Sequence, residues 1–302
     1  GGRKGGEGRQ RLFRFGDDDD DGDDLNDAVV AERRRNKTNK SSKGGKGGKK
    51  SKNGKAKTDN GNKKAKVLQI VNVSKSDALF RSLVTSEALG RAVCEFAGWT
   101  GVGTRLAQDQ VWAKPPGAPP LAYHRDSPYF MFDPPHVVTV WIALDDMTPD
   151  VGPLRYVKGS HLWGEGRVGS AGKFFQSDGG TGLLHSAARR AGIDDPESTL
   201  EVVSTAGLGR GGLSIHDGRT WHGSGGNVSG EGNGGSSCGR PRRGIGLHFV
   251  PANVRFTEDA SKSRLWGRYV KGAMEEEGRN VRDVEVPEED FPVVWKPSSS
   301  SS

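Results

Sequence analysis

The sequence predicts a mainly β domain, an all-β barrel or sandwich, with a few flanking helices and a disordered N-terminal tail. From residue 105 onward, short apolar or alternating runs recur, and Gly, Pro and Asp clusters separate them. Residues 1–66, in contrast, show almost no apolar periodicity. With 302 residues, the chain is long enough for one large domain or two small ones.

The N-terminal segment is expected to be disordered. It contains an acidic run at Asp17–Asp21 and a stretch rich in Lys, Gly, Asn and Ser from Arg33 to Lys66. Such a composition cannot bury enough surface to offset chain entropy. We therefore divide the chain into a tail at 1–66, a folded domain at 67–297 and a terminal Ser run at 298–302.

Charge is unevenly divided between these parts. Residues 1–66 hold 20 Lys+Arg and 11 Asp+Glu, a charge of +9, so the +7 of the whole chain leaves −2 for the remainder. The basic excess is therefore interpreted as a solubilising linker, with a nuclear-import signal or loose polyanion contact as alternatives. The nearly neutral folded domain gives no signal for nucleic-acid binding.

Cysteine usage and hydropathy predict a soluble, intracellular protein. Cys94 and Cys238 are isolated thiols without CxxC spacing, which favours a reducing compartment over a disulfide framework. No apolar run approaches the roughly 20 residues that a bilayer span needs. Ser298–Ser302 carries no peroxisomal SKL-type address, and a start at Gly1 rather than Met leaves room for an upstream targeting peptide.

Order is expected to begin with a β segment at Val67–Val73, followed by helices over Asp77–Val84 and Glu87–Ala97. Ser86 is a plausible N-cap for the second helix, and Gly98 lies just past its end. The expected strands are Arg105–Lys114, Val137–Leu144, Leu154–Val157, Leu200–Ser204, Leu213–His216 and Gly244–Val250.

Two further segments lack a strand pattern. Gly164–Pro196 is polar, Gly-rich and poorly periodic, which indicates an insertion or lid. Glu275–Pro297 is charged and is expected to be peripheral.

A candidate metal site combines His124, Asp126 and His222. Residues two apart in a strand point to the same side, so His124 and Asp126 are expected to converge on one ion. His222 lies 98 positions after His124, near a predicted strand end, and a barrel brings such distant ends together. Two histidines and one carboxylate leave positions open on the ion, as in non-haem Fe(II) oxygenases.

His216 competes with His222 for the third position. It lies inside the apolar stretch Leu-Ser-Ile-His, where a core histidine is the commoner case. His222 precedes Gly-Ser-Gly, whose small residues allow a close approach to the backbone. We therefore favour His222.

At these residues the chain resembles the phytanoyl-CoA dioxygenase family of Fe(II)/2-oxoglutarate-dependent oxygenases, over roughly Val67–Phe256. The resembling segments are Tyr-His-Arg-Asp-Ser at 123–127, Val-Trp-Ile-Ala-Leu-Asp-Asp at 140–146, Gly-Pro-Leu-Arg-Tyr-Val-Lys-Gly-Ser-His at 152–161, Trp-His-Gly-Ser-Gly-Gly-Asn at 221–227 and Arg-Arg-Gly-Ile-Gly-Leu-His-Phe at 242–249. The resemblance implies a double-stranded β-helix (jelly-roll, cupin-like) core, with iron on His124, Asp126 and His222.

It also implies an arginine that pairs with the distal carboxylate of 2-oxoglutarate. Arg242 matches the family's arginine, and strand parity places it on one face with Gly244, Gly246 and His248, whereas Arg243 lies on the other face. Ser224 matches a serine that binds the same carboxylate, and Trp141 matches an aromatic wall of the cosubstrate site, with a core tryptophan as the competing interpretation.

The chain departs from the family at two places. Arg125 stands between the first two ligands, where relatives often carry Gln, and Gly230–Gly239 is longer than usual and is interpreted as a flexible loop. Arg125 puts the identity of the substrate in doubt. If the substrate is a coenzyme A ester, Arg155 and Lys158 join Arg125 as candidate contacts for its phosphates.

The implied activity is hydroxylation of a C–H bond in a small-molecule or acyl substrate, acyl-CoA included, with release of succinate and CO2. Halogenating relatives replace the carboxylate ligand with a small residue, so the intact Asp126 argues for hydroxylation. The alternative is a non-enzymatic cupin-like barrel that binds a metal or small molecule. A protein or nucleic-acid hydroxylase recruited by the Lys-rich tail is a third hypothesis. The sequence does not indicate the oligomeric state.

Overall fold

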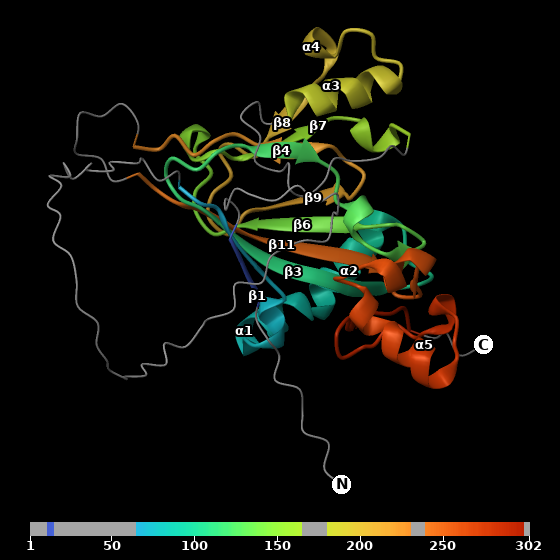
Figure 1. Cartoon of the computed structure of the whole chain (residues 1–302). Helices are drawn as coiled ribbons and strands as arrows, with labels where there is room; N and C mark the ends of the chain where they lie inside the picture. Colours follow the sequence, from blue (N-terminus) through green and yellow to red (C-terminus); the bar gives the residue numbers. More distant parts are fainter. Residues whose placement is uncertain (1–10, 15–64, 165–179, 231–238, 299–302) are drawn as a thin grey trace, which may run out of the picture.

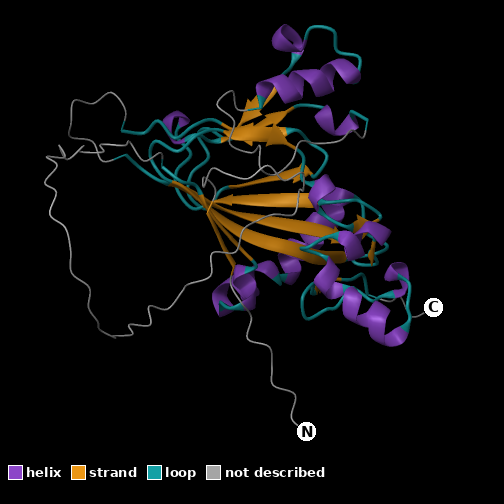
Figure 2. Cartoon of the chain, in the orientation of Figure 1, coloured by secondary structure: helices purple, strands orange, loops and turns teal. Residues whose placement is uncertain are grey.

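The computed structural model describes residues 11–14, 65–164, 180–230 and 239–298, and in them two antiparallel sheets lie face to face (Figures 1 and 2). Helices cover the outer side of each sheet, and the candidate site lies between the sheets. No helix in these ranges is long and apolar enough to cross a bilayer.

The larger sheet has seven strands in the order β1-β2-β3-β11-β6-β9, with β13 pairing with β3. Its strands are β1 (Arg11–Arg14), β2 (Leu68–Val71), β3 (Thr104–Lys114), β6 (Val138–Ala143), β9 (Leu213–Asp217), β11 (Arg242–Pro251) and β13 (Val293–Trp295).

The smaller sheet has four strands in the order β4-β10-β7-β8, and a two-stranded ribbon pairs β12 with β5. These strands are β4 (Leu121–His124), β5 (Phe132–Asp133), β7 (Leu154–Val157), β8 (Val202–Ser204), β10 (His222–Ser224) and β12 (Arg255–Phe256). A short 3-10 turn, η2 (Ser127–Tyr129), follows β4 after two residues.

Alternation along the central strand β11 gives the larger sheet two different faces. Ile245, Leu247 and Phe249 join an apolar cluster on the outer face, which includes Val84 and Val93 from the covering helices. The alternate positions, from Arg242 to His248, face the smaller sheet. The mainly β architecture predicted from the sequence is therefore confirmed.

The two predicted N-terminal helices are present as α1 (Ala78–Val84) and α2 (Glu87–Ala97). The Ser86 hydroxyl accepts a hydrogen bond from the Leu89 backbone N–H at 3.4 Å, which caps α2. Gly98 ends α2 with φ 72°, a left-handed conformation that glycine adopts without a Cβ penalty.

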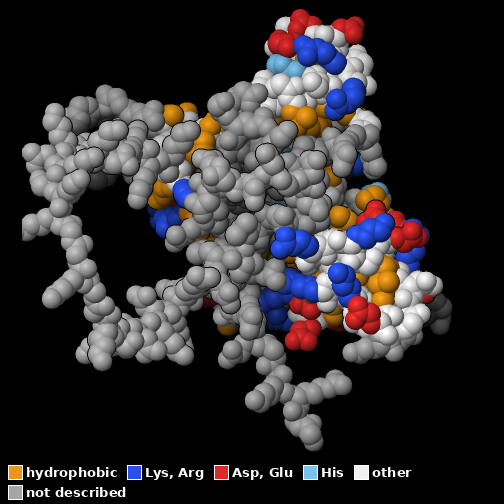
Figure 3. All heavy atoms as spheres, in the orientation of Figure 1, with side chains coloured by type: hydrophobic (Ala, Val, Ile, Leu, Met, Phe, Trp, Pro, Cys, Tyr) orange, Lys and Arg blue, Asp and Glu red, His pale blue; other side chains and the backbone are white. Residues whose placement is uncertain are grey.

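The expected insertion at Gly164–Pro196 contains a helix. Residues 165–179 lie outside the described ranges, but α3 (Thr181–Arg190) follows them, and α4 (Pro196–Thr199) comes next. Leu184 and Ala187 of α3 pack with Val157 of β7 and with Trp221, which directly precedes β10. The Gly-rich sequence before these apolar residues obscured their helical spacing. On the face drawn in Figure 3, charged side chains of both signs gather at the α3–α4 end.

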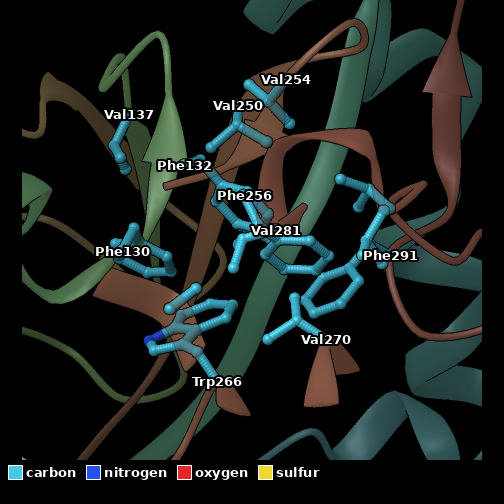
Figure 4. Close-up of a cluster of buried hydrophobic side chains, with 14 residues drawn as sticks. Phe130, Phe132, Val137, Val250, Val254, Phe256, Trp266, Val270, Val281 and Phe291 are labelled. Carbon is cyan, nitrogen blue, oxygen red and sulfur yellow. The ribbon is translucent and has the colours of Figure 1, made fainter. Parts of the chain in front are cut away.

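The prediction that Glu275–Pro297 is peripheral was wrong. After α5 (Lys271–Glu277), the chain buries Val281, Val284, Val286 and Phe291 in a cluster that includes Phe132, Phe256 and Trp266 (Figure 4). Buried Arg105 donates hydrogen bonds to the Val286 and Phe291 carbonyls and ties the segment to β3. Acidic residues lie between these buried apolar residues, so the apolar pattern was not recognised in the sequence.

We expected residues 1–66 to lack structure. Within this range the structure describes Arg11–Arg14 as strand β1, antiparallel to β2, whereas residues 1–10 and 15–64 lie outside the described ranges. Residues 231–238, most of the predicted loop insertion, and 299–302 lie outside as well. The domain boundaries therefore stay a prediction.

Candidate metal and carboxylate site

His124 and His222 are cross-strand neighbours in the smaller sheet. They pair directly in the β4–β10 register, and their ring centroids lie 4.2 Å apart. Nδ1 of His124 donates to the Ala122 carbonyl (2.8 Å) and Nδ1 of His222 to the Thr220 carbonyl (3.0 Å). These bonds fix the tautomer, so each Nε2 presents a lone pair, as a metal-binding imidazole requires.

Asp126 reaches the histidines from a turn. It follows β4 in the αR conformation (φ −81°, ψ −42°) and is the N-cap residue of η2, so its convergence with His124 does not come from strand alternation as predicted. Its backbone N–H donates to the Gly218 carbonyl at 2.8 Å. A Cβ on Gly218 would lie 2.7 Å from Val137 Cβ, so this close approach requires glycine.

The three side chains form one buried group. Oδ1 of Asp126 lies 3.8 Å from Nε2 of His124 and 3.6 Å from Nε2 of His222, and the candidate ligand atoms all lie within 4.8 Å of one another. The structure thus brings together the three residues that the sequence nominated. A divalent cation fits this donor set of two imidazoles and one carboxylate.

The pKa shifts of His124 and Asp126 favour the binding of a cation. Burial, then His222, lowers the pKa of His124 to about 3, so its imidazole stays neutral. Burial opposes ionisation of Asp126, but His222 and the hydrogen bond from His216 hold its pKa well below the ordinary value. His124 therefore offers a neutral imidazole and Asp126 an ionised carboxylate.

His216, the competitor for the third position, contacts the carboxylate. Its Nε2 donates to Oδ2 of Asp126 at 3.2 Å, and its ring lies 4.6 Å from that of His222. Burial lowers its pKa to about 4. His216 thus lies behind Asp126, as expected for a histidine that is not itself a ligand.

Arg242 is fully buried on the inner face of β11, whereas Arg243 is exposed and pairs with Asp145 at 2.6 Å. Nε and Nη1 of Arg242 have no hydrogen-bond partner among the described residues. Its Cζ lies 5.8 Å from the ring centroid of Trp141, which is 4% exposed. Unpaired guanidinium N–H groups in a dry site are costly, and an anion would satisfy them.

Lys114, which the sequence analysis did not single out, lies beside Arg242. The two residues are partners in the β3–β11 register. Nζ of Lys114 donates to the Ser224 hydroxyl at 2.9 Å and to the Gly225 carbonyl at 2.6 Å. Burial, then the charge of Arg242, lowers the pKa of Lys114 to about 6. Ser224, a predicted cosubstrate contact, thus belongs to a pocket with the side chains of Arg242 and Lys114.

Other residues of the site were also missed. The Thr139 hydroxyl donates to Asp126, and His248 in turn contacts Thr139. The alternation of residues along β11 could have identified His248, because it places His248 on the same face of the strand as Arg242.

The three cations considered for coenzyme A phosphates are in different settings. Arg125 is buried, with its Cζ 5.6 Å from the Trp221 ring centroid. Lys158 pairs with Glu201 at 2.9 Å on the surface, and Arg155 is exposed on β7. Arg125 is therefore buried, whereas Arg155 and Lys158 are exposed.

Comparisons with known proteins agree with this architecture. The family model described as phytanoyl-CoA dioxygenase (PhyH) matches residues 11–232. A solved structure of SnoK, a non-heme alpha ketoglutarate dependent carbocyclase from nogalamycin biosynthesis, is similar with a TM-score of 0.51 and 20% identity, covering 75% of this chain and 75% of that chain. This likeness shows a shared fold.

Two further solved structures are similar at lower scores. The epimerase SnoN, in complex with Fe3+, alpha ketoglutarate and nogalamycin RO, has a TM-score of 0.48 and 21% identity, covering 63% of this chain and 66% of that chain. AviO1 from Streptomyces viridochromogenes Tue57 has a TM-score of 0.44 and 24% identity, covering 62% and 69%. This chain thus spans slightly less than two thirds of the epimerase. No match was found among curated protein sequences.

Proposed function

Because this chain belongs to the phytanoyl-CoA dioxygenase family, we propose that it is a non-haem Fe(II)- and 2-oxoglutarate-dependent dioxygenase that hydroxylates a C–H bond. The family match confirms the resemblance seen in the sequence. Together with the group His124, Asp126 and His222, it confirms iron and 2-oxoglutarate as the expected cofactor class. The proposal includes a double-stranded β-helix core, which two facing antiparallel sheets support.

The observation that carries the proposal is the pairing of two complementary sites. A buried group of two imidazoles and a carboxylate suits a divalent metal, and the unpaired Arg242 guanidinium suits a carboxylate. Ser224, two residues after His222 on β10, links them, because Lys114 binds its hydroxyl beside Arg242. A barrel that only binds a metal has no need of the second site.

In this assignment His124, Asp126 and His222 hold the iron, and Arg242, Lys114 and Ser224 hold the distal carboxylate of 2-oxoglutarate. Trp141 walls the cosubstrate, and the burial of all these residues excludes water. When bound, iron and 2-oxoglutarate supply the oxidation: O2 gives one oxygen atom to succinate and one to the hydroxylated substrate, and CO2 is released.

The substrate is proposed to be a small molecule or an acyl compound, acyl-CoA included. The reaction is proposed to be hydroxylation because Asp126 keeps the carboxylate in place. SnoN is named an epimerase and SnoK a carbocyclase. These names describe the similar structures and are not assigned to this chain.

An anaerobic titration with Fe(II) and 2-oxoglutarate tests the proposal through the visible charge-transfer band of the chelate. His222→Ala should abolish the band. Arg242→Ala should weaken 2-oxoglutarate binding about 10- to 100-fold, the loss expected when a charged hydrogen-bond partner is removed. Arg243→Ala is the matched control, since that neighbouring arginine points to the surface and should leave binding unchanged.

Absence of the band in the unaltered protein would reject the oxygenase and favour the non-enzymatic metal- or small-molecule-binding barrel. An equal loss in Arg243→Ala and Arg242→Ala would reject the assignment of the carboxylate pocket. Deleting residues 33–64, which keeps strand β1 (Arg11–Arg14), tests the hypothesis of a macromolecular substrate recruited by the Lys-rich tail, because an enzyme acting on a small molecule should keep its turnover.

A further inference from the structure

A row of polar side chains crosses the inner face of the larger sheet and ends at the metal carboxylate. Its members come from strands β9, β6, β11, β3 and β2 and are His216, Thr139, His248, Gln110 and Gln69. Thr139 lies opposite His216 on one neighbouring strand and opposite His248 on the other. The outward-facing neighbours Val138 and Val140 belong to the apolar core.

Hydrogen bonds along the row leave only one arrangement of protons. An ionised Asp126 can only accept, so the Thr139 hydroxyl donates to its Oδ2 at 2.6 Å. The Thr139 oxygen therefore accepts from Nδ1 of His248 at 2.9 Å. A neutral His248 then has a lone pair on Nε2, which accepts from the Gln110 amide at 2.6 Å. The Gln69 side-chain amide donates a hydrogen bond to the side-chain oxygen of Gln110.

The two oxygens of Asp126 consequently have different environments. Oδ2 receives hydrogen bonds from Thr139 and from His216. Oδ1 faces Nε2 of His124 and of His222. Two donors reduce the electron density that Oδ2 can offer to a cation and hold the carboxylate plane in one orientation.

We propose that Thr139, oriented by His248 and Gln110, is a positioning residue that makes Asp126 bind the metal through Oδ1 alone. This inference rests on the proposed function, since it assumes a metal at the His124, Asp126 and His222 group. A carboxylate can bind a cation through one oxygen or two. Binding through one oxygen leaves one more position open for the cosubstrate and oxygen, so Thr139 matters for what the site can accept.

Thr139→Val and Thr139→Ser form a matched pair. Valine keeps the shape of the side chain and removes the hydroxyl, whereas serine keeps the hydroxyl. Mn(II) affinity of the metal-free protein, measured by EPR without cosubstrate or substrate, is the first readout. Thr139→Val should bind Mn(II) about 10- to 100-fold more weakly, the usual cost of losing a group that orients a metal ligand. Thr139→Ser should restore binding to near the wild-type value.

The charge-transfer band with Fe(II) and 2-oxoglutarate is the second readout. In Thr139→Val the band should shift or weaken, because an Asp126 carboxylate that is no longer held in one orientation presents Oδ1 less well to the metal. The melting temperature of each metal-free variant separates this effect from a loss of folding. If Thr139→Val does not fold, His248→Leu decides, since it removes the group that orients the hydroxyl and should weaken Mn(II) binding by about threefold or more.

The outcomes separate this inference from the proposed function. If the wild-type protein binds no Mn(II), the metal site itself is rejected, and the inference with it. If the wild type binds Mn(II) and Thr139→Val binds it equally well with an unchanged band, only the role of Thr139 is rejected. The same holds for unchanged affinity in His248→Leu where that variant decides.

Discussion

The two faces of the larger sheet use the same strands for opposite purposes. On the outer face, Leu247 and Phe249 are completely buried among aliphatic side chains of the covering helices. On the inner face, Arg242 and Lys114 are just as buried, but they have no carboxylate partner among the described residues. The outer face therefore supplies stability, and the inner face gives up stability to keep polar groups oriented for ligands.

The largest stability effect is expected on the outer face. Leu247→Ala removes a side chain with 0% exposure from the core cluster and should lower the free energy of unfolding by about 2–5 kcal/mol. Because Leu247 points away from the site, Mn(II) affinity of the folded variant should be unchanged. Urea denaturation and EPR titration measure the two effects. A tenfold loss of Mn(II) affinity would show that the two faces are not independent.

On the inner face, Lys114 should make stability depend on pH. Its folded-state pKa of about 6 lies below the ordinary value of 10.5, so between these values the unfolded chain carries a proton that the folded chain lacks. Stability from this group therefore rises with pH across that window, by about 1.4 kcal/mol per unit, and is constant below it.

Lys114→Met isolates this contribution. The difference in unfolding free energy between wild type and variant should change by about 3 kcal/mol from pH 7 to pH 9, in favour of the wild type at the higher pH. Saturating 2-oxoglutarate should flatten the dependence, because a carboxylate beside the ammonium favours its charged form. Urea denaturation at pH 7, 8 and 9 measures both effects. Parallel curves for the two proteins would mean that the folded protein keeps Lys114 charged.

The same contrast explains which features could be predicted from the sequence. Alternation along β11 is a local property, so the sequence of that strand is enough to separate the buried Arg242 from the exposed Arg243. Lys114 ends a strand that was predicted, but its role depends on the register that sets it beside Arg242. Register is fixed by pairing between segments far apart in the sequence, which a single-strand pattern does not contain.

Turns and mixed segments were the other source of error. Asp126 reaches the histidines because the chain turns into η2 shortly after β4, a local conformation that the His-x-Asp pattern does not specify. Helix α3 and the buried valines after α5 lie in Gly-rich or acidic surroundings. In both segments a few apolar residues at suitable spacing outweigh the polar average.

The smallest predicted effect is the difference between alanine substitutions at two glycines of the inner face, Gly244 and Gly246. A Cβ on Gly244 would lie 2.6 Å from Cε2 of Trp141, a rigid ring, whereas a Cβ on Gly246 would lie 3.3 Å from the flexible Gln110 side chain. Gly244→Ala must therefore displace Trp141 and should cost about 1–3 kcal/mol of stability, whereas Gly246→Ala should cost less than about 1 kcal/mol.

The displaced ring should also disturb the carboxylate pocket, because Trp141 lies against the guanidinium of Arg242. We expect Gly244→Ala to weaken 2-oxoglutarate binding in the charge-transfer titration and Gly246→Ala to leave it near the wild-type value. Both glycines lie on one face of one strand, so a difference between them comes from what each faces and not from backbone flexibility. Equal losses in the two variants would instead assign the effect to the backbone of β11, and Trp141 would no longer be needed as a wall of the cosubstrate site.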